Sequence, residues 1–189
     1  MTYYGAKELA AAFRTVRNNT IKIAEEIPEE KYDFQPSPKS RTVQQTLAHI
    51  GVAVSFQSYV HVNKISDLKS VNWMELFPTF MAEEQKPRTK AETIAFLKSE
   101  GEKFASFVEG LPESFLAERI QMPPGAEPSS KTRFEMLMSV KEHEMHHRGQ
   151  LMLIQRMLGL VPHLTRQMEE RMAQMAAAQQ TAGAAQAQA

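Results

Sequence analysis

The sequence predicts an all-α protein: a four-helix bundle with a long crossover between helices two and three, plus a low-complexity C-terminal tail. Three observations carry this prediction. Apolar residues recur at spacings of three and four along four stretches of comparable length, as helices facing a common core require. Three of those stretches open on a Thr-x-x-Gln or Thr-x-x-Glu capping box, at Thr42, Thr89 and Thr132. The segment between the second and third stretches lacks periodicity, which is typical of a connection.

The first two helices are predicted from their apolar rows. The first row ends before Pro28 and consists of Ala6, Leu9, Phe13, Val16, Thr20, Ile23 and Ile27, with one polar member. A proline-rich segment follows, and the cap at Thr42 then begins the second helix. Val43, Leu47, Ile50 and Val54 form one row of this helix, and His49 belongs to the neighbouring row with Ala53, Phe56 and Val60. His49 is therefore expected on the inward half of the helix.

The second half of the chain repeats this pattern. Residues 62–88 are expected to form the crossover, with one short helix at most. The third helix begins after Thr89 and is closed by Pro112. A loop rich in proline follows, with no strand pattern, and the fourth helix runs from Thr132 to Gly159 and Pro162. Residues 1–162 are therefore expected to form one bundle.

Residues 163–189 are expected to be an accessory or poorly ordered extension. Leu164, Met168, Met172 and Met175 would give a weakly amphipathic helix, and the sequence AAAQQTAGAAQAQA after them is too simple to build a core. Its alanines and glutamines favour helix, so a helical conformation there would not imply stable packing.

Composition excludes several functions. Twenty-two basic residues balance twenty-two acidic ones, so the electrostatic attraction that favours nucleic acid or an acidic membrane is missing. The chain has no cysteine, so any thiol chemistry must use an external thiol. The N-terminal residues lack the pattern of a secretion signal, and no apolar run is long enough to cross a bilayer, so we expect a cytoplasmic protein.

A histidine cluster within the fourth helix is the strongest indication of function. His143 and His147 lie four residues apart, so both imidazoles can face one metal ion, whereas His146 faces elsewhere. If the second helix packs beside the fourth, His49 supplies a third nitrogen. Three neutral imidazoles leave one or two coordination positions for water or substrate, as in a catalytic rather than a closed structural site.

The neighbours of the cluster are candidates for supporting roles. Gln150 lies one turn beyond His147 and could hydrogen-bond a ligating imidazole, and Arg148 could form an ion pair or meet an anionic substrate. Glu144 completes the H-E-x-x-H pattern of zincin proteases, in which it would be the general base. The extended zincin pattern fails at Gln150 and Leu153, so Glu144 is also interpreted as a solvated surface acid. The remaining histidines, His61, His146 and His163, are interpreted as structural or exposed.

The chain resembles the DinB/YfiT-like family of metalloenzymes over roughly residues 6–162. The resemblance lies in IPEEKYDFQPSPKSRTVQQTLAHI, RTKAETIAFLKSEGEKF and HEMHHRGQLMLIQRMLGLVP. The family pattern is one histidine on helix two and His-x-x-x-His, often followed by Gly-Gln, on helix four, and His49, His143 and His147 occupy these positions. The resemblance implies a divalent metal, nickel or zinc, held by the three histidines. It also implies a homodimer, which the Met-rich helix faces favour too.

The sequence leaves three hypotheses for the function of this site. Related bundles transfer small thiols such as bacillithiol or mycothiol to electrophiles, so the resemblance implies thiol S-transfer to a small-molecule substrate, with the thiol as co-substrate. Hydrolysis would use the same open ion. The third hypothesis is a non-catalytic bundle in which the metal only braces helices two and four. The sequence identifies no catalytic acid or base and no substrate pocket.

Overall fold

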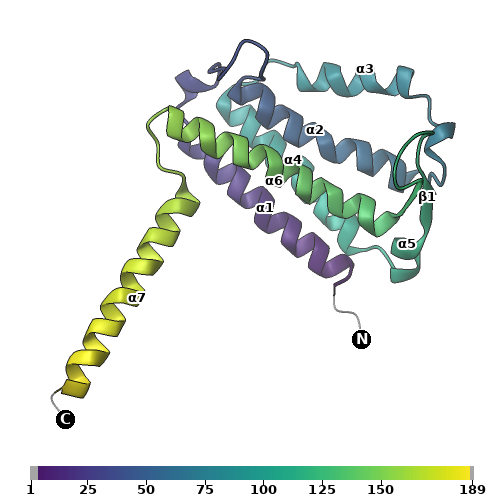
Figure 1. The fold of residues 1–189 in the computed structure, drawn as a ribbon. Coiled ribbons are helices and arrows are strands. Elements are labelled where there is room, and N and C mark those ends of the chain that lie inside the picture. The colour runs from purple at the N-terminus through teal and green to yellow at the C-terminus, as the bar shows by residue number, and fades with distance from the viewer. Residues whose placement is uncertain (1–3, 188–189) are drawn as a thin grey trace.

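Four long helices form the bundle, as the apolar rows predict. The structure is a computed structural model that describes residues 4–187, with side chains up to residue 180. The bundle helices are α1 (Ala6–Glu26), α2 (Val43–Val62), α4 (Lys90–Glu109) and α6 (Arg133–Met157). Helices α1 and α2 each pack against both α4 and α6, so α1 and α2 occupy opposite corners (Figure 1). The chain is therefore all-α with a four-helix bundle at its centre.

The predicted capping boxes all form. The hydroxyls of Thr42, Thr89 and Thr132 accept hydrogen bonds from the third backbone N–H of α2, α4 and α6, respectively. In each case the side-chain oxygen of the Gln or Glu three residues later accepts a hydrogen bond from the backbone N–H of the cap residue. These local bonds fix the start of three bundle helices, and the start of α2 in turn sets the position of His49.

Elements outside the bundle are more ordered than the sequence indicates. The crossover contains α3 (Trp73–Glu84), which packs along α2 on the outside of the bundle (Figure 1) and is preceded by the 3-10 turn η2 (Leu68–Ser70). Another 3-10 turn, η1 (Glu29–Lys31), follows α1, and α5 (Glu113–Ala117) follows α4. The proline-rich loop, where the sequence shows no strand pattern, lies between two short strands. Strands β1 (Arg119–Gln121) and β2 (Ser130–Thr132) pair antiparallel across the proline-containing loop, too short for an alternating pattern.

Helix α7 (His163–Ala187) leaves the bundle and projects away from it (Figure 1). The side chains of Met168, Met172 and Met175 on it are exposed. Part of the predicted low-complexity tail, residues 188–189, lies outside the described residues. None of the helices described is both long and apolar enough to pass through a membrane.

A buried ion pair joins all four bundle helices. The guanidinium Nε of Arg17 on α1 lies 2.9 and 3.0 Å from the two carboxylate oxygens of Glu144 on α6. Arg17 also donates to the carbonyl oxygen of Leu97 on α4 at 2.7 Å and to that of Ile50 on α2 at 3.4 Å. Only 4% of the Arg17 side chain and 2% of the Glu144 side chain are exposed. Arg17 approaches α4 at Gly101. A Cβ atom added at Gly101 would lie 2.9 Å from Cγ of Arg17. This position therefore requires glycine.

A second buried polar group, His61, should make the fold sensitive to acid. Burial, followed by the charge of Arg133, lowers the pKa of His61 to about 4 from the usual 6.5. Between these pH values the unfolded chain binds a proton that the folded chain does not, so the free energy of unfolding falls as the pH falls. We expect His61→Gln to remove on the order of 3 kcal/mol of this pH dependence, measured by urea denaturation at about pH 7 and about pH 4. If the free energy of unfolding of the variant depended on pH as strongly as that of the parent protein, the low pKa of His61 would be contradicted.

Candidate metal site

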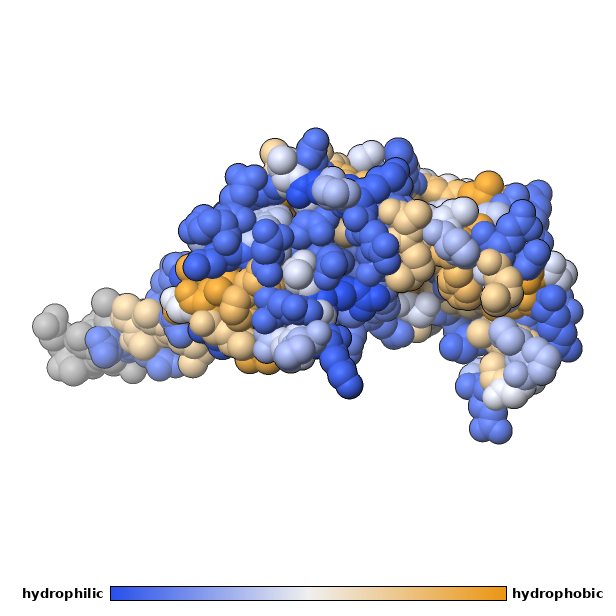
Figure 2. Space-filling model, turned by 90° about the horizontal axis from the view of Figure 1, so that it is seen from above, coloured by the Kyte–Doolittle hydropathy of each residue, from blue (hydrophilic) through white to orange (hydrophobic). Residues whose placement is uncertain are grey.

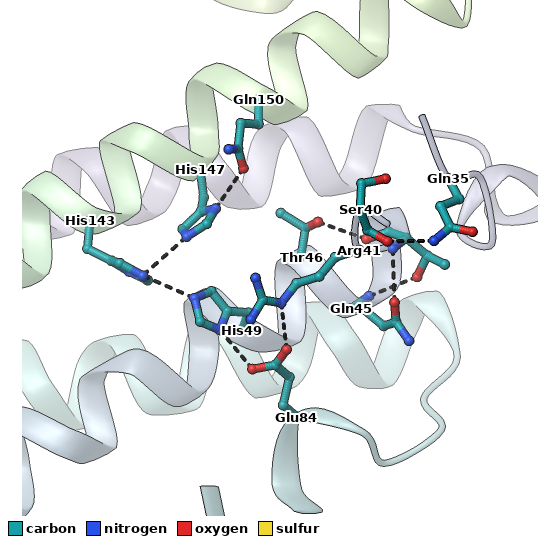
Figure 3. A network of polar contacts seen from close by, with 11 residues as sticks. Gln35, Ser40, Arg41, Gln45, Thr46, His49, Glu84, His143, His147 and Gln150 are labelled. Carbon is teal, nitrogen blue, oxygen red and sulfur yellow. Dashed lines mark hydrogen bonds and ion pairs between the residues drawn. The ribbon is translucent and has the colours of Figure 1, made fainter. Parts of the chain in front are cut away.

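The structure brings His49, His143 and His147 together between α2 and α6 (Figure 3). The Nε2 atom of His143 lies 3.1 Å from Nε2 of His49 and 3.2 Å from Nε2 of His147. One ligand atom from each of the three residues lies within 4.8 Å of the others. Metal to imidazole bonds are about 2.0 to 2.1 Å long, so nitrogens at such separations can share one ion.

Hydrogen bonds set the orientation of two of the rings. Nδ1 of His49 lies 2.7 Å from a carboxylate oxygen of Glu84, and Nδ1 of His147 lies 2.8 Å from the side-chain oxygen of Gln150. Because both oxygens are acceptors, each Nδ1 carries the proton and each Nε2 presents a lone pair. This is the tautomer that a metal ligand needs.

The chemistry of these nitrogens fits a cation. The Nε2 lone pairs of His49 and His147 both face Nε2 of His143, at 3.1 and 3.2 Å, and a cation between the three rings would be attracted by these lone pairs. Burial, followed by the charges of His147 and His49, lowers the pKa of His143 to about 4, so this ring is neutral at pH 7. Burial also lowers the pKa of His147, although the bond to Gln150 opposes the change. Nδ1 of His143 is buried without a hydrogen-bond partner in the described part of the chain.

Glu84 and Arg41 belong to the site, and the sequence reasoning missed both. Glu84 is the last residue of α3, and its second carboxylate oxygen accepts a hydrogen bond from Nε of Arg41 at 2.6 Å (Figure 3). Burial raises the pKa of Glu84, but the bonds from Arg41 and His49 outweigh it, so its pKa lies below the usual value. The carboxylate therefore stays ionised and holds His49 while Arg41 holds the carboxylate.

Of the other candidate residues, some contact the histidine cluster and others lie elsewhere in the bundle. Gln150 contacts His147 directly, and its amide nitrogen lies 3.2 Å from Nε2 of the exposed His146. Within the described residues no hydrogen bond or ion pair joins Arg148 to the cluster, and its charge acts on His163 at the start of α7. His61 is buried against Gln57, and His163 against Asn19. Neither lies in the site.

The two interpretations of Glu144 are both wrong. Glu144 is 1% exposed, so it is not a solvated surface acid. Both of its carboxylate oxygens are bound by Arg17 in the core, so it supports no ligating histidine and cannot serve as the general base of a zincin. It follows His143 by one residue on α6, which turns its side chain by about 100° around the helix axis.

Two cavities meet at the histidines. The larger, of about 630 Å³, contacts His147 and Gln150 and carries the basic residues Lys39 and Arg41. The smaller, of about 280 Å³, lies between α2, α3 and α6 and contacts His49 and His143. Glu84 and Met81 line both cavities. Cavities therefore border the histidine cluster on two sides.

Comparison with known proteins identifies relatives that share this fold. The uncharacterised protein YjoA of Bacillus subtilis (strain 168) is 25% identical over 154 residues, covering 82% of this chain and 91% of its own. The crystal structure of YjoA, a DinB-like protein, superposes with a TM-score of 0.60 at 23% identity, covering 80% of this chain and 92% of that one.

Two further solved structures share the fold at lower identity. YfiT from Bacillus subtilis, described as "a probable metal-dependent hydrolase with an unusual four-helix bundle topology", has a TM-score of 0.64 at 12% identity, covering 85% of this chain and 91% of its own. The colibactin self-resistance protein ClbS, solved in complex with a double-stranded DNA, has a TM-score of 0.60 at 14% identity, covering 82% of this chain and 98% of its own.

The sequence profile of the DinB superfamily matches residues 12–151, which include all three clustered histidines. This match covers most of the bundle and confirms the resemblance stated above. The chain therefore belongs to the DinB superfamily.

Proposed function

We propose that the protein binds a divalent metal ion, nickel or zinc, through His49, His143 and His147, and uses it to activate a small-molecule thiol for S-transfer. The observation that carries the proposal is the convergence of three Nε2 atoms at the meeting point of two cavities. Neutral imidazole nitrogens suit either ion. When bound, such an ion supplies the positive charge that lowers the pKa of a thiol or a water to near neutrality.

The residues around the site favour a thiol over water as the nucleophile. Both carboxylate oxygens of Glu84 are engaged, by Arg41 and His49, so Glu84 is not free to remove a proton. A thiol has an ordinary pKa of about 8.5 and water one of about 15.7, so a thiol needs far less assistance. The chain has no cysteine, so the thiol must be a co-substrate.

The two cavities can hold the two reactants. Lys39, Arg41 and Glu84 line the larger cavity, and because Arg41 is paired with Glu84, the remaining positive charge is that of Lys39, which suits a thiol that carries a carboxylate. In the transfer, the thiol would release its proton to water, and the sulfur would then form a bond to the electrophilic carbon of the acceptor while the leaving group departs with the electron pair of the bond that breaks. Glu84 and Gln150 hold the imidazoles in place while this occurs.

Metal-dependent hydrolysis is the second candidate. The likeness to YfiT favours it, because that protein is described as "a probable metal-dependent hydrolase". Nucleic acid does not enter the proposal, because the balanced charge of this chain offers no general attraction for it and the DNA complex concerns ClbS alone.

The two reactions and a bracing role can be separated by assay. Full-length protein without a histidine tag would be loaded with nickel or zinc and offered bacillithiol, mycothiol or glutathione with a chloroalkyl acceptor, and separately ester and amide substrates. We expect thiol-dependent turnover that His147→Ala abolishes and His146→Ala retains. Turnover without thiol would favour the hydrolase. Bound metal without turnover on any substrate would favour a metal that only braces α2 and α6.

Removing Glu84 should weaken metal binding without removing a ligand. Without its carboxylate, the imidazole of His49 loses the acceptor that fixes its tautomer and orientation. Loss of such a supporting carboxylate costs about 10- to 100-fold in metal affinity. We therefore expect Glu84→Ala to bind zinc about 10- to 100-fold more weakly by calorimetry, and Glu84→Gln to lose less because its amide oxygen still accepts the bond.

Glu83→Ala is the matched control for this experiment. Glu83 precedes Glu84 on α3, and its carboxylate pairs with Lys86 and Arg88 rather than with a histidine. The control removes the same charge beside the site. Equal weakening in Glu83→Ala and Glu84→Ala would show that the effect is general electrostatics and not the bond to His49.

A further inference from the structure

Helix α3 presents apolar residues that the bundle core does not use. Glu84 is its one buried residue, whereas Met74, Phe77 and Met81 are 86%, 50% and 45% exposed. Figure 2, viewed from the α3 side, shows apolar residues gathered over the part of the face where this helix runs. An apolar helix face that does not contribute to the core needs another explanation.

That face forms one wall of the smaller cavity. Phe77 and Phe80 of α3 line it from one side, Ala53 and Phe56 of α2 from another, and Val140 of α6 closes it. His49 and His143 lie in the same lining, so an occupant would contact the histidine site directly. Glu84 is the one carboxylate in this lining, and its charge is already paired with Arg41. The lining is therefore mostly apolar, with Gln57 and Ser139 as its uncharged polar members besides the histidines.

Contacts at both ends hold this wall in place. Trp73 at the start of α3 stacks on Phe56 with ring centroids 5.1 Å apart, and it lies 5.6 Å from the ring of Phe77. The indole N–H of Trp73 donates to the carbonyl oxygen of Leu68 at 3.0 Å. At the other end, Glu84 binds Arg41 and His49. The cavity between these anchors is preformed, which lowers the cost of ordering a ligand.

We propose that the cavity beneath α3 binds the apolar part of the acceptor substrate, a compact aromatic or bicyclic group. The role as a substrate subsite rests on the function proposed above, whereas the binding itself does not. A cavity of about 150 Å³ accepts benzene, so the volume of about 280 Å³ suits a group of up to two fused rings. The aromatic walls favour a planar ring, and the scarcity of charge disfavours an ionic one.

The single tryptophan offers a direct measurement of binding, because Trp73 touches two cavity walls, Phe56 and Phe77. The probe is 1-indanol, a neutral bicyclic aromatic alcohol, titrated into the full-length protein. Trp73 would be excited at the red edge of its absorption, where the probe does not absorb. We expect a saturable change in Trp73 emission and a binding isotherm of the same midpoint by calorimetry.

Two alanine-to-phenylalanine variants locate the binding site. Ala53→Phe adds a ring inside the cavity and should weaken 1-indanol binding by at least about tenfold. Ala82→Phe adds the same ring to the exposed side of α3 and should change the affinity by less than about twofold. Absence of saturable binding to the parent protein, or equal loss in both variants, would overturn the proposal.

Metal content measured on the same samples keeps the two proposals separate. We expect Ala53→Phe to keep its metal, because Ala53 is not one of the three clustered histidines. Bound metal with no 1-indanol binding would contradict the subsite and leave the metal proposal intact. Conversely, 1-indanol binding to a protein that takes up no metal would support the cavity and contradict the metal site.

Discussion

Replacing Glu144 by alanine should lower the free energy of unfolding by about 3 to 5 kcal/mol. The variant leaves the guanidinium of Arg17 buried, with 4% of its side chain exposed and no counter-ion. Two carbonyl oxygens, of Leu97 and Ile50, remain as acceptors, but neither carries a full charge. Because Arg17 contacts all three other bundle helices, the loss affects the whole bundle. Urea denaturation monitored by circular dichroism measures the change.

Two variants define the outcome of this experiment. Glu142→Ala removes an exposed acid from the same helix and should cost less than about 0.5 kcal/mol. Arg17→Met combined with Glu144→Leu removes both charges and should recover most of the stability lost in Glu144→Ala, because apolar replacement of a whole buried pair is tolerated. If Glu144→Ala lowered the free energy of unfolding as little as Glu142→Ala, the buried ion pair would not contribute substantially to the stability of the bundle.

Replacing His147 by alanine should abolish or strongly weaken metal binding. Two imidazoles hold a divalent ion much less well than three, and the lost ring is the one fixed by Gln150. Folding should persist, since the apolar faces of the four helices supply most of the stability. Metal content by elemental analysis and affinity by calorimetry measure the effect.

His146→Ala is the matched control. His146 neighbours His147 and touches Gln150, yet its exposed ring takes no part in the three-histidine cluster. The control should keep its metal. Full metal retention in His147→Ala would show that His147 is not a metal ligand. Equal metal loss in His147→Ala and His146→Ala would also contradict its assignment as a ligand.

The fold was predictable because its signals are local. Capping at Thr42, Thr89 and Thr132, together with Pro28 and Pro112, marks helix ends through bonds within a few residues. The small β1–β2 pair was not predictable, because strands of three residues are too short for alternation to be distinguished from chance. Helix α3 was only partly predictable, because its apolar row is short, the helix contains Pro78, and the row lines a cavity instead of the bundle core.

The site was predictable to the extent that helix geometry defines it. The four-residue spacing of His143 and His147 places two nitrogens on one face, and the inward row of α2 supplies His49. Glu84 lies thirty-five residues from His49 along the chain, so only the packing of α3 reveals their contact. Arg17 did leave a signal, because it lies on the apolar face four residues after Phe13, where a charge requires a partner. The sequence could not show that this partner is Glu144.

The central claim is that three imidazoles of this chain hold one metal ion. X-ray absorption spectroscopy of untagged full-length protein loaded with zinc or nickel tests it most directly. The account predicts three imidazole nitrogens among the ligands, at about 2.0 to 2.1 Å for zinc. A spectrum with one imidazole or none, or a protein that retains no metal after loading and dialysis, would contradict it.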